Sequence, residues 1–201
     1  MLLPAVDPHE RLRELGFAML LAEQRPISPD ELAAASGSDD VARLLDQLGE
    51  AGWIDRDGDG RLTGSAGLSL TEGPHHLRLG ETTFRTWCAY DALGIPAALG
   101  RDAMVETTCG ACGQPIVVQM TAGHPDRRGP EQLWLAERGD DLRSQFCAPT
   151  VLLCGPDHGQ TWAAAPQHAG ALLDLEAAAI KGAEDWGSCA AAAARIGSVG
   201  G

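Results

Sequence analysis

Residues 84–101 read FRTWCAYDALGIPAALGR. They lie near the N-terminal end of the larger of two predicted domains, residues 76–201. The stretch predicts a helix over Phe84–Leu99, interrupted near Gly94 and Pro96, because glycine weakens a helix and proline removes a backbone donor. A thiol, a carboxyl group and two large rings stand together near its beginning. That combination indicates chemistry rather than packing alone.

Cys88 and Asp91 are three residues apart on this predicted helix, so their side chains project to one face. Trp87 and Tyr90 flank the thiol, and rings of that size can exclude water. In a dry pocket the carboxylate can accept the proton of the thiol, and the resulting acid can later donate it. The same spacing also occurs on ordinary helices, so these residues alone leave a structural role open.

The chain that surrounds this stretch, residues 76–201, predicts a mixed β-sheet core with flanking helices. A helix is predicted over Leu172–Lys181 from its apolar spacing, and the Ala190–Ala194 run is expected to extend a last helix. The predicted strands are His76–Leu79, Met104–Thr108, Pro115–Thr121, Leu133–Ala136, Val151–Cys154 and Thr161–Ala164.

Residues 1–75 predict a separate winged-helix-like module at the N-terminus. Three helical segments come first, and Ser28 with Glu31 forms a capping box at the start of the second. A turn-rich hairpin tip at Asp55–Gly60 follows. The predicted fold class is therefore α+β, with this module followed by the β-sheet core.

The charge of the chain argues against nucleic-acid binding. The net charge is −13, and the segment from Arg25 to Ala66 has four arginines against nine acidic residues. Phosphate would repel such a surface, so the first module is interpreted as structural or dimerising. Anionic membrane surfaces are disfavoured for the same reason, and no apolar run approaches the roughly 18 residues of a membrane span. The opening residues lack the order of a signal peptide, which predicts a cytoplasmic protein.

Six cysteines occur, and in a cytoplasmic chain they are expected to be reduced. Cys109 and Cys112 form a Cys-x-x-Cys turn that could be a metal clip, a redox pair or a structural turn. A structural zinc site needs four ligands and no second Cys-x-x-Cys exists, so the structural turn is favoured. The histidines lack the spacing of the common ligand motifs, and His158 is predicted to be a solvated loop residue.

Residues 84–101 resemble the signature segment of the alkylmercury lyase family, in which a Trp-Cys-Ala-x-Asp helix precedes a Pro-Ala-x-x-Gly-Arg turn. Residues 141–147 are similar to the family segment that carries a second essential cysteine, here Cys147. The position of Cys109 resembles that of a third, structural cysteine. A winged helix is also the usual first domain of that family.

The resemblance implies an enzyme that cleaves the carbon–mercury bond of an organomercurial by protonolysis. Cys88 and Cys147 would bind mercury and Asp91 would carry the proton, so all three would contact the metal. Cys109 and Cys112 would be accessory, as a structural turn or a relay for mercury. No organic cofactor is expected, and free thiols or a mercuric reductase would accept the Hg(II) product.

One segment departs from the family pattern. The family commonly follows its second cysteine with Asn-His-Val-His-Phe-Phe, whereas this chain has Ala148–Leu153, without histidine or an aromatic ring. Two alternatives therefore stay open. One is a relative of the family used for copper or zinc thiolate chemistry, and the other is a non-catalytic metal sensor with a DNA-binding winged helix.

Overall fold

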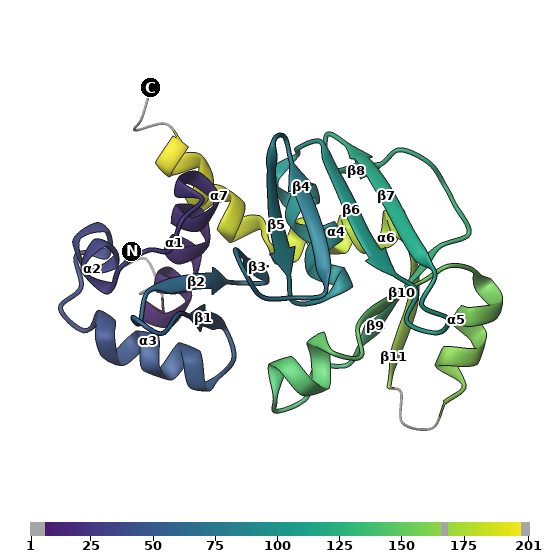
Figure 1. The fold of residues 1–201 in the computed structure, drawn as a ribbon, viewed down its shortest axis with the longest axis horizontal. Helices are drawn as coiled ribbons and strands as arrows, with labels where there is room; N and C mark the ends of the chain where they lie inside the picture. The colour runs from purple at the N-terminus through teal and green to yellow at the C-terminus, as the bar shows by residue number, and fades with distance from the viewer. Residues whose placement is uncertain (1–6, 166–168, 198–201) are drawn as a thin grey trace, which may run out of the picture. The chain divides into compact units, whose positions relative to one another are not determined.

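The computed structural model describes residues 7–165 and 169–197, which divide into two compact units (Figure 1). The first unit contains the described chain up to Ala66 together with the segment from Ser188 onward. The second unit is Gly67–Gly187. Among the described residues, no helix combines the length and apolar character needed to cross a membrane.

The first unit is built from helices and one β-hairpin. Its hairpin strands pair antiparallel, and its last helix lies beside the first in Figure 1. Both described ends of the chain therefore belong to this unit. The elements are α1 (Pro8–Glu23), α2 (Pro29–Ser36), α3 (Val41–Glu50), β1 (Ile54–Arg56), β2 (Leu62–Ser65) and α7 (Gly187–Gly197).

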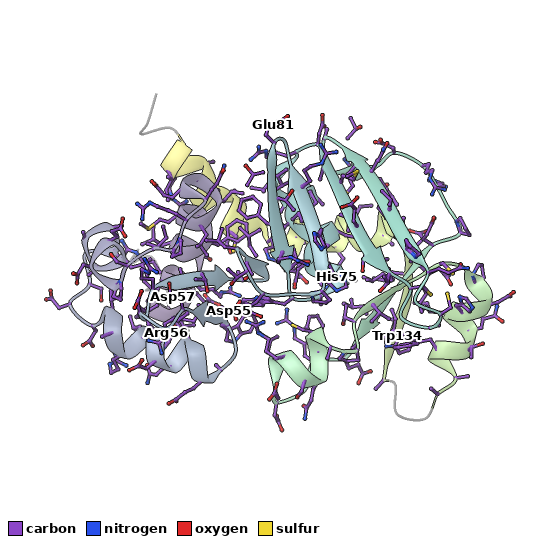
Figure 2. The ribbon with its side chains drawn as sticks, viewed as in Figure 1. Asp55, Arg56, Asp57, His75, Glu81 and Trp134 are labelled. Atoms are coloured by element: carbon purple, nitrogen blue, oxygen red, sulfur yellow. The ribbon has the colours of Figure 1, made fainter. Side chains whose placement is uncertain are left out.

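Local sequence explains where these elements begin and what they bury. The predicted capping box is present: the Ser28 hydroxyl accepts the Glu31 N–H at 3.2 Å, and Glu31 accepts the Ser28 N–H at 2.8 Å. The apolar stripe of α3 is buried, as its spacing predicts. At the hairpin tip Asp57 accepts two backbone N–H groups and pairs with Arg61 at 2.9 Å; Figure 2 labels Asp57 with its neighbours.

The second unit holds a larger and a smaller β-sheet. Each strand pairing described within this unit is antiparallel, so the mixed sheet predicted from the sequence is wrong in strand direction. In the larger sheet the order is β3 (Leu68–Ser69), β5 (Thr82–Thr86), β4 (His75–Leu79), β6 (Ala103–Thr108), β7 (Pro115–Thr121) and β8 (His124–Pro125). In the smaller sheet the order is β10 (Val151–Leu153), β9 (Gln132–Ala136) and β11 (Gly170–Asp174).

Helices cover one face of the larger sheet. Figure 1 shows α4 (Ala89–Leu99) and α6 (Leu175–Asp185) behind β4 and β6, while β7 alternates exposed and buried residues as a half-buried strand should. The two helices approach closely because glycines face each other. A Cβ added at Gly94 would lie 3.0 Å from the Gly182 Cα and 2.7 Å from the Trp186 ring. The predicted interruption is wrong, because α4 runs through both Gly94 and Pro96.

Five of the predicted strands are confirmed within one residue at each end, as β4, β6, β7, β9 and β10. The predicted strand Thr161–Ala164 is wrong, because this segment belongs to α5 (Pro156–Ala163). The helix predicted from Leu172 begins at Leu175, since Gly170–Asp174 pairs with β9. In both places tertiary pairing overrides a weak local preference.

Candidate functional site

Cys88 is the N-cap of α4 and not a residue inside a helix. Its backbone is extended, with φ −142° and ψ 170°, and the helix starts at Ala89. The predicted helix over Phe84–Leu99 is therefore wrong at its start, where Thr82–Thr86 forms β5. The chain turns from a sheet strand into a helix at the thiol, so both elements fix the position of its sulfur.

Cys88 and Asp91 form a reciprocal cap at this helix start. The Cys88 N–H donates to the Asp91 carboxylate at 2.8 Å, and the Asp91 N–H points to the Cys88 sulfur. This is a capping box in which a thiol replaces the usual hydroxyl. The spacing of three residues thus brings thiol and carboxyl together, through a cap rather than through neighbouring positions on a helix face.

Cys147 reaches the same place from another element. It ends η1 (Leu142–Cys147), a π-helical segment in which the Ala148 N–H donates to the Arg143 carbonyl at 2.9 Å. The turn after it is held near α4, because the Thr150 carbonyl accepts the Ala89 N–H at 3.4 Å. The ligand atoms of Cys88, Asp91 and Cys147 all lie within 4.8 Å of one another. The structure thus brings together the three residues that the sequence singled out.

This site is almost closed to water. Cys88 is 0% exposed, Asp91 4% and Cys147 6%. The Arg143 guanidinium lies 3.3 Å from the centroid of the Trp87 ring. Gly67 has a left-handed φ of +91°, and a Cβ there would come within 2.6 Å of the Asp91 carboxyl carbon. Glycine is therefore required for the backbone to cover the carboxyl group.

Tyr90 contributes a wall to the pocket and not a reacting group. It is buried, with its ring edge-on to Phe146 and Trp186. Its hydroxyl donates to the Asp185 carboxylate at 2.7 Å, so the hydroxyl is directed to α6. The expected role of the aromatic rings in excluding water agrees with this arrangement.

Burial controls the protonation of the site. Desolvation raises the pKa of the Cys88 thiol well above its usual value, and the hydrogen bond with Cys147 and the charge of Asp91 act in the same direction. Desolvation also raises the pKa of Asp91 to about 6, against the opposing hydrogen bonds from Cys88 and the charge of Arg143. At neutral pH the thiol thus keeps its proton, while Asp91 can accept one with little cost.

A second group of ligand atoms contains the Cys-x-x-Cys turn. Cys109 and Cys112 lie with Cys154 and His158, and their ligand atoms are all within 4.8 Å of one another. His158 is not a solvated loop residue as predicted, because it stands in the first turn of α5 with Nδ1 3.1 Å from the Cys154 sulfur. The sequence signal that identifies these two partners is Cys154-x-x-x-His158, a spacing outside the histidine motifs considered.

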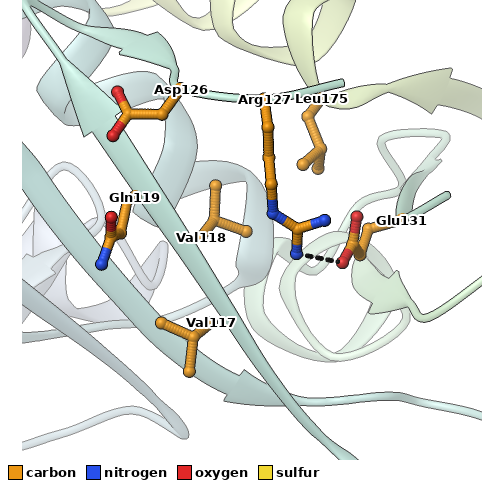
Figure 3. A pocket seen from close by; sticks show the side chains of 7 residues that line it. All are labelled: Val117, Val118, Gln119, Asp126, Arg127, Glu131 and Leu175. Atoms are coloured by element: carbon orange, nitrogen blue, oxygen red, sulfur yellow. Dashed lines mark hydrogen bonds and ion pairs between the residues drawn. The ribbon is translucent and has the colours of Figure 1, made fainter. Parts of the chain in front are cut away.

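Two further pockets in the described part of the second unit are lined by no cysteine or histidine. One of about 300 Å³ is lined by Val117, Gln119 and Leu175 among others, and Figure 3 shows Arg127 turned toward Glu131, with their side chains 3.0 Å apart. No thiol, histidine or hydroxyl nucleophile is among its lining residues. The two cysteine groups remain the sites with chemistry.

Comparison with known proteins agrees with this geometry. The sequence model of the family described as alkylmercury lyase matches residues 68–187, almost the whole second unit. A protein named alkylmercury lyase from Streptomyces lividans is 33% identical over 152 residues, which are 71% of this chain and 67% of the relative. A protein of the same name from Pseudomonas putida is 29% identical over 69% of this chain and 66% of its own length.

A solved structure supports the fold independently. The mercury-bound form of MerB2 superimposes with a TM-score of 0.78 at 19% sequence identity, over 90% of this chain and 96% of that one. At this identity the likeness concerns the fold alone. With the family match spanning the unit that holds both cysteine groups, the chain belongs to the alkylmercury lyase family.

Proposed function

We propose that this protein cleaves the carbon–mercury bond of an organomercurial by protonolysis, with Cys88 and Cys147 as mercury ligands and Asp91 as proton carrier. The observation that carries the proposal is the buried group of two thiols and one carboxyl with ligand atoms within 4.8 Å. Mercury is a soft Lewis acid that prefers thiolate to oxygen or nitrogen donors. The names of the relatives point to the same activity.

Cys147 is the first ligand in this proposal, because it is slightly exposed whereas Cys88 is fully buried. Its sulfur bonds to mercury and releases its proton to solvent or to the departing counterion of the substrate. The R–Hg group then lies beside Cys88. As the Cys88 sulfur bonds to mercury, its proton passes to the Asp91 carboxylate, whose pKa of about 6 suits a transient acceptor.

The second thiolate increases the electron density on mercury and on the carbon bound to it. Asp91 then gives its proton to that carbon, the carbon–mercury bond breaks, and the bonding electron pair forms the new C–H bond. The products are R–H and Hg(II) held by two sulfurs, and Asp91 returns to its carboxylate form. The net charge of the site does not change in this step, because one negative charge passes from the two-thiolate mercury group to the Asp91 carboxylate as the proton moves to carbon; the closed pocket keeps water from competing as the proton donor.

Hg(II) bound by two protein thiolates needs an acceptor. We propose free low-molecular-weight thiols or a mercuric reductase, since exchange between thiolates is the low-cost route for a soft metal. All six cysteines are free, which suits the reducing cytoplasm.

We assign the first unit a structural role as a winged-helix-like module that does not read DNA. The order of three helices and a hairpin supports the winged-helix assignment. The acidic character of this segment supports the absence of DNA binding, because α3 and the hairpin present carboxylates to solvent.

The test is release of benzene from phenylmercury by the purified chain, followed by headspace gas chromatography in the presence of excess free thiol. Cys189→Ser is the matched control, because Cys189 is a buried free thiol of the first unit. Benzene release by wild type and control, with none from Cys88→Ser, supports the proposal. Binding of phenylmercury without any benzene would exclude the lyase activity and favour a carrier or sensor.

A further inference from the structure

We infer that Cys109, Cys112, Cys154 and His158 bind one Zn²⁺ ion in a closed tetrahedral site. The site would join the turn between β6 and β7 to the junction between β10 and α5. It is separate from the proposed reaction and would act by holding chain segments together.

The distances between the donor atoms suit zinc. With Zn–S near 2.3 Å and Zn–N near 2.05 Å, a tetrahedron places sulfurs about 3.8 Å apart and sulfur and nitrogen about 3.5 Å apart. The Cys112 and Cys154 sulfurs are 3.9 Å apart, and the Cys109 sulfur is 3.7 Å from His158 Nδ1. The 3.1 Å contact between Cys154 and His158 is shorter and would lengthen slightly around an ion. The two sulfurs of a disulfide are about 2.05 Å apart, so these cysteines are not joined by a disulfide bond.

The first half of the site is a turn wrapped around one sulfur. The Cys109 N–H donates to the Gln114 carbonyl and the Gly113 N–H to the Cys109 carbonyl, each at 2.8 Å. Backbone N–H groups of Cys154, Cys112 and Ala111 point to the Cys109 sulfur. Donors arranged in this way stabilise a thiolate, which is the form that binds metal. The turn is therefore built to present a sulfur ligand and not merely to reverse the chain.

The second half brings its two ligands together through a helix start. Gly155 is the N-cap of α5 and Pro156 its first residue, a favoured position for proline. This places His158 in the first turn, four residues after Cys154. The Gly110 N–H donates to the Leu152 carbonyl at 2.9 Å, so the backbone of β10 already lies against the Cys-x-x-Cys turn.

Four protein donors leave no open coordination position, which is the mark of a structural rather than a catalytic zinc site. Three thiolates and one imidazole are also a donor set that zinc prefers, whereas Mg²⁺ and Ca²⁺ prefer oxygen. The ligands are separated by about 40 residues of chain, so a bound ion would restrict a long loop in the unfolded state. β10 connects this site to the turn after Cys147. A bound ion would therefore help to hold that part of the second unit in position.

The test is metal analysis of the full chain, expressed and purified without mercury because Hg(II) would displace zinc from thiolates. We expect about one zinc per chain in wild type and in Cys189→Ser, and less than about a tenth of that in Cys112→Ser/His158→Ala. Chelation should lower the Tm of wild type and leave that of the double variant unchanged. Iron in place of zinc, or wild-type zinc content in the double variant, would overturn the inference.

A second measurement remains decisive if the double variant does not fold. Wild-type protein stripped by a chelator is titrated with Co²⁺ under reducing conditions. Saturation at about one ion per chain, with the strong visible absorption of tetrahedral cobalt and sulfur-to-cobalt charge transfer, supports the site. Absence of these bands from folded, reduced protein would refute it.

Discussion

The two cysteine groups of the second unit differ in the number of donors and in their contact with water. Cys88, Cys147 and Asp91 provide two sulfurs and one carboxylate in a closed pocket. The other group provides three sulfurs and an imidazole, with Cys112 exposed and two of its members half-buried. Four donors would complete the coordination of a metal ion, whereas in the proposed reaction two thiols bind a mercury atom that still carries its carbon group when the second thiol arrives.

Under the two proposals, one fold holds an inert and a reactive metal-thiolate site close together in sequence. In the four-donor group a bound metal would have no vacant position. In the buried group the third member is an acid whose pKa is raised to about 6 by desolvation. Reactivity therefore follows from an incomplete ligand set placed beside a proton source in a dry site.

The largest loss of cleavage is expected when either thiol of the buried group is replaced. Cys88→Ser and Cys147→Ser should each lower benzene release from phenylmercury by at least about a thousandfold, the scale on which loss of a nucleophile acts. Serine is a hard oxygen donor and a poor mercury ligand. Single-turnover rates measured by gas chromatography check this, with circular dichroism to establish folding. Turnover near the wild-type rate in either variant would remove that residue from the reaction.

Asp91→Asn should separate binding from cleavage. The amide cannot donate an acidic proton, so hydrocarbon release should fall by about 10² to 10⁴ while phenylmercury still binds. Mass spectrometry of the intact adduct measures binding, and headspace analysis measures release. Normal release of methane or benzene would show that another group carries the proton.

The buried carboxyl group of Asp91 should also make the free energy of unfolding depend on pH. Its pKa rises from 3.8 to about 6 on folding, so the folded state binds the extra proton between these values. The contribution of protonated Asp91 is therefore full below pH 3.8 and is lost as the pH rises through about 6. Relative to Asp91→Asn, the free energy of unfolding of wild type should fall by up to about 3 kcal/mol between pH 4 and 7. Urea unfolding at several pH values tests this, and parallel curves for the two proteins would contradict it.

Gly94→Ala should disturb the buried site and leave the four-donor group intact. The new Cβ would meet Trp186 at 2.7 Å, and α4 cannot retreat without moving its own N-cap, Cys88. Overpacking of this kind costs about 1–3 kcal/mol. Thermal unfolding measures the loss, and zinc content should be unchanged. A Tm equal to that of wild type would show that the two helices separate easily.

The smallest effect on cleavage is expected from the four-donor group itself. Cys109→Ser/Cys112→Ser should lower stability, yet reduce single-turnover cleavage by less than about tenfold, or 1.4 kcal/mol. Rapid-quench measurement of the first turnover distinguishes cleavage from slow removal of Hg(II). Near-complete loss of the first turnover in folded protein would make these cysteines part of the reaction. The two cysteine groups would then not divide into a structural and a reactive one.

Sequence reasoning found the buried group but not the geometry that joins it. The spacing of Cys88 and Asp91 indicated proximity, and the structure supplies it through a helix cap at Cys88, two residues after β5 ends at Thr86. Periodicity could not place that boundary, because Thr82–Thr86 becomes a strand through its pairing with β4 and β3, which a single sequence does not show. Cys147 was identified by resemblance, since nothing local connects it to residue 88.

Sequence motifs alone do not predict that Cys109, Cys112, Cys154 and His158 form one group. Cys109-x-x-Cys112 was recognised, but its partners lie about 40 residues further along the chain, Cys154 directly after β10 and His158 in α5. The register that joins them comes from the Gly110–Leu152 hydrogen bond and the pairing of β10 with β9. Such long-range pairing is set by the whole fold, so a single sequence does not display it.

The π-helical turn before Cys147 ties the length of this segment to its conformation. A π-helix has about one residue more per turn than an α-helix, and each residue of an α-helix rotates the chain by about 100°. Rewinding Leu142–Cys147 as an α-helix of the same length would therefore turn the thiol about 100° further round the helix and away from its partner. Removing one residue at the same time would restore the direction of the thiol. Relatives with a segment one residue shorter should therefore be α-helical here, and relatives with a segment of this length should keep the π-helical turn.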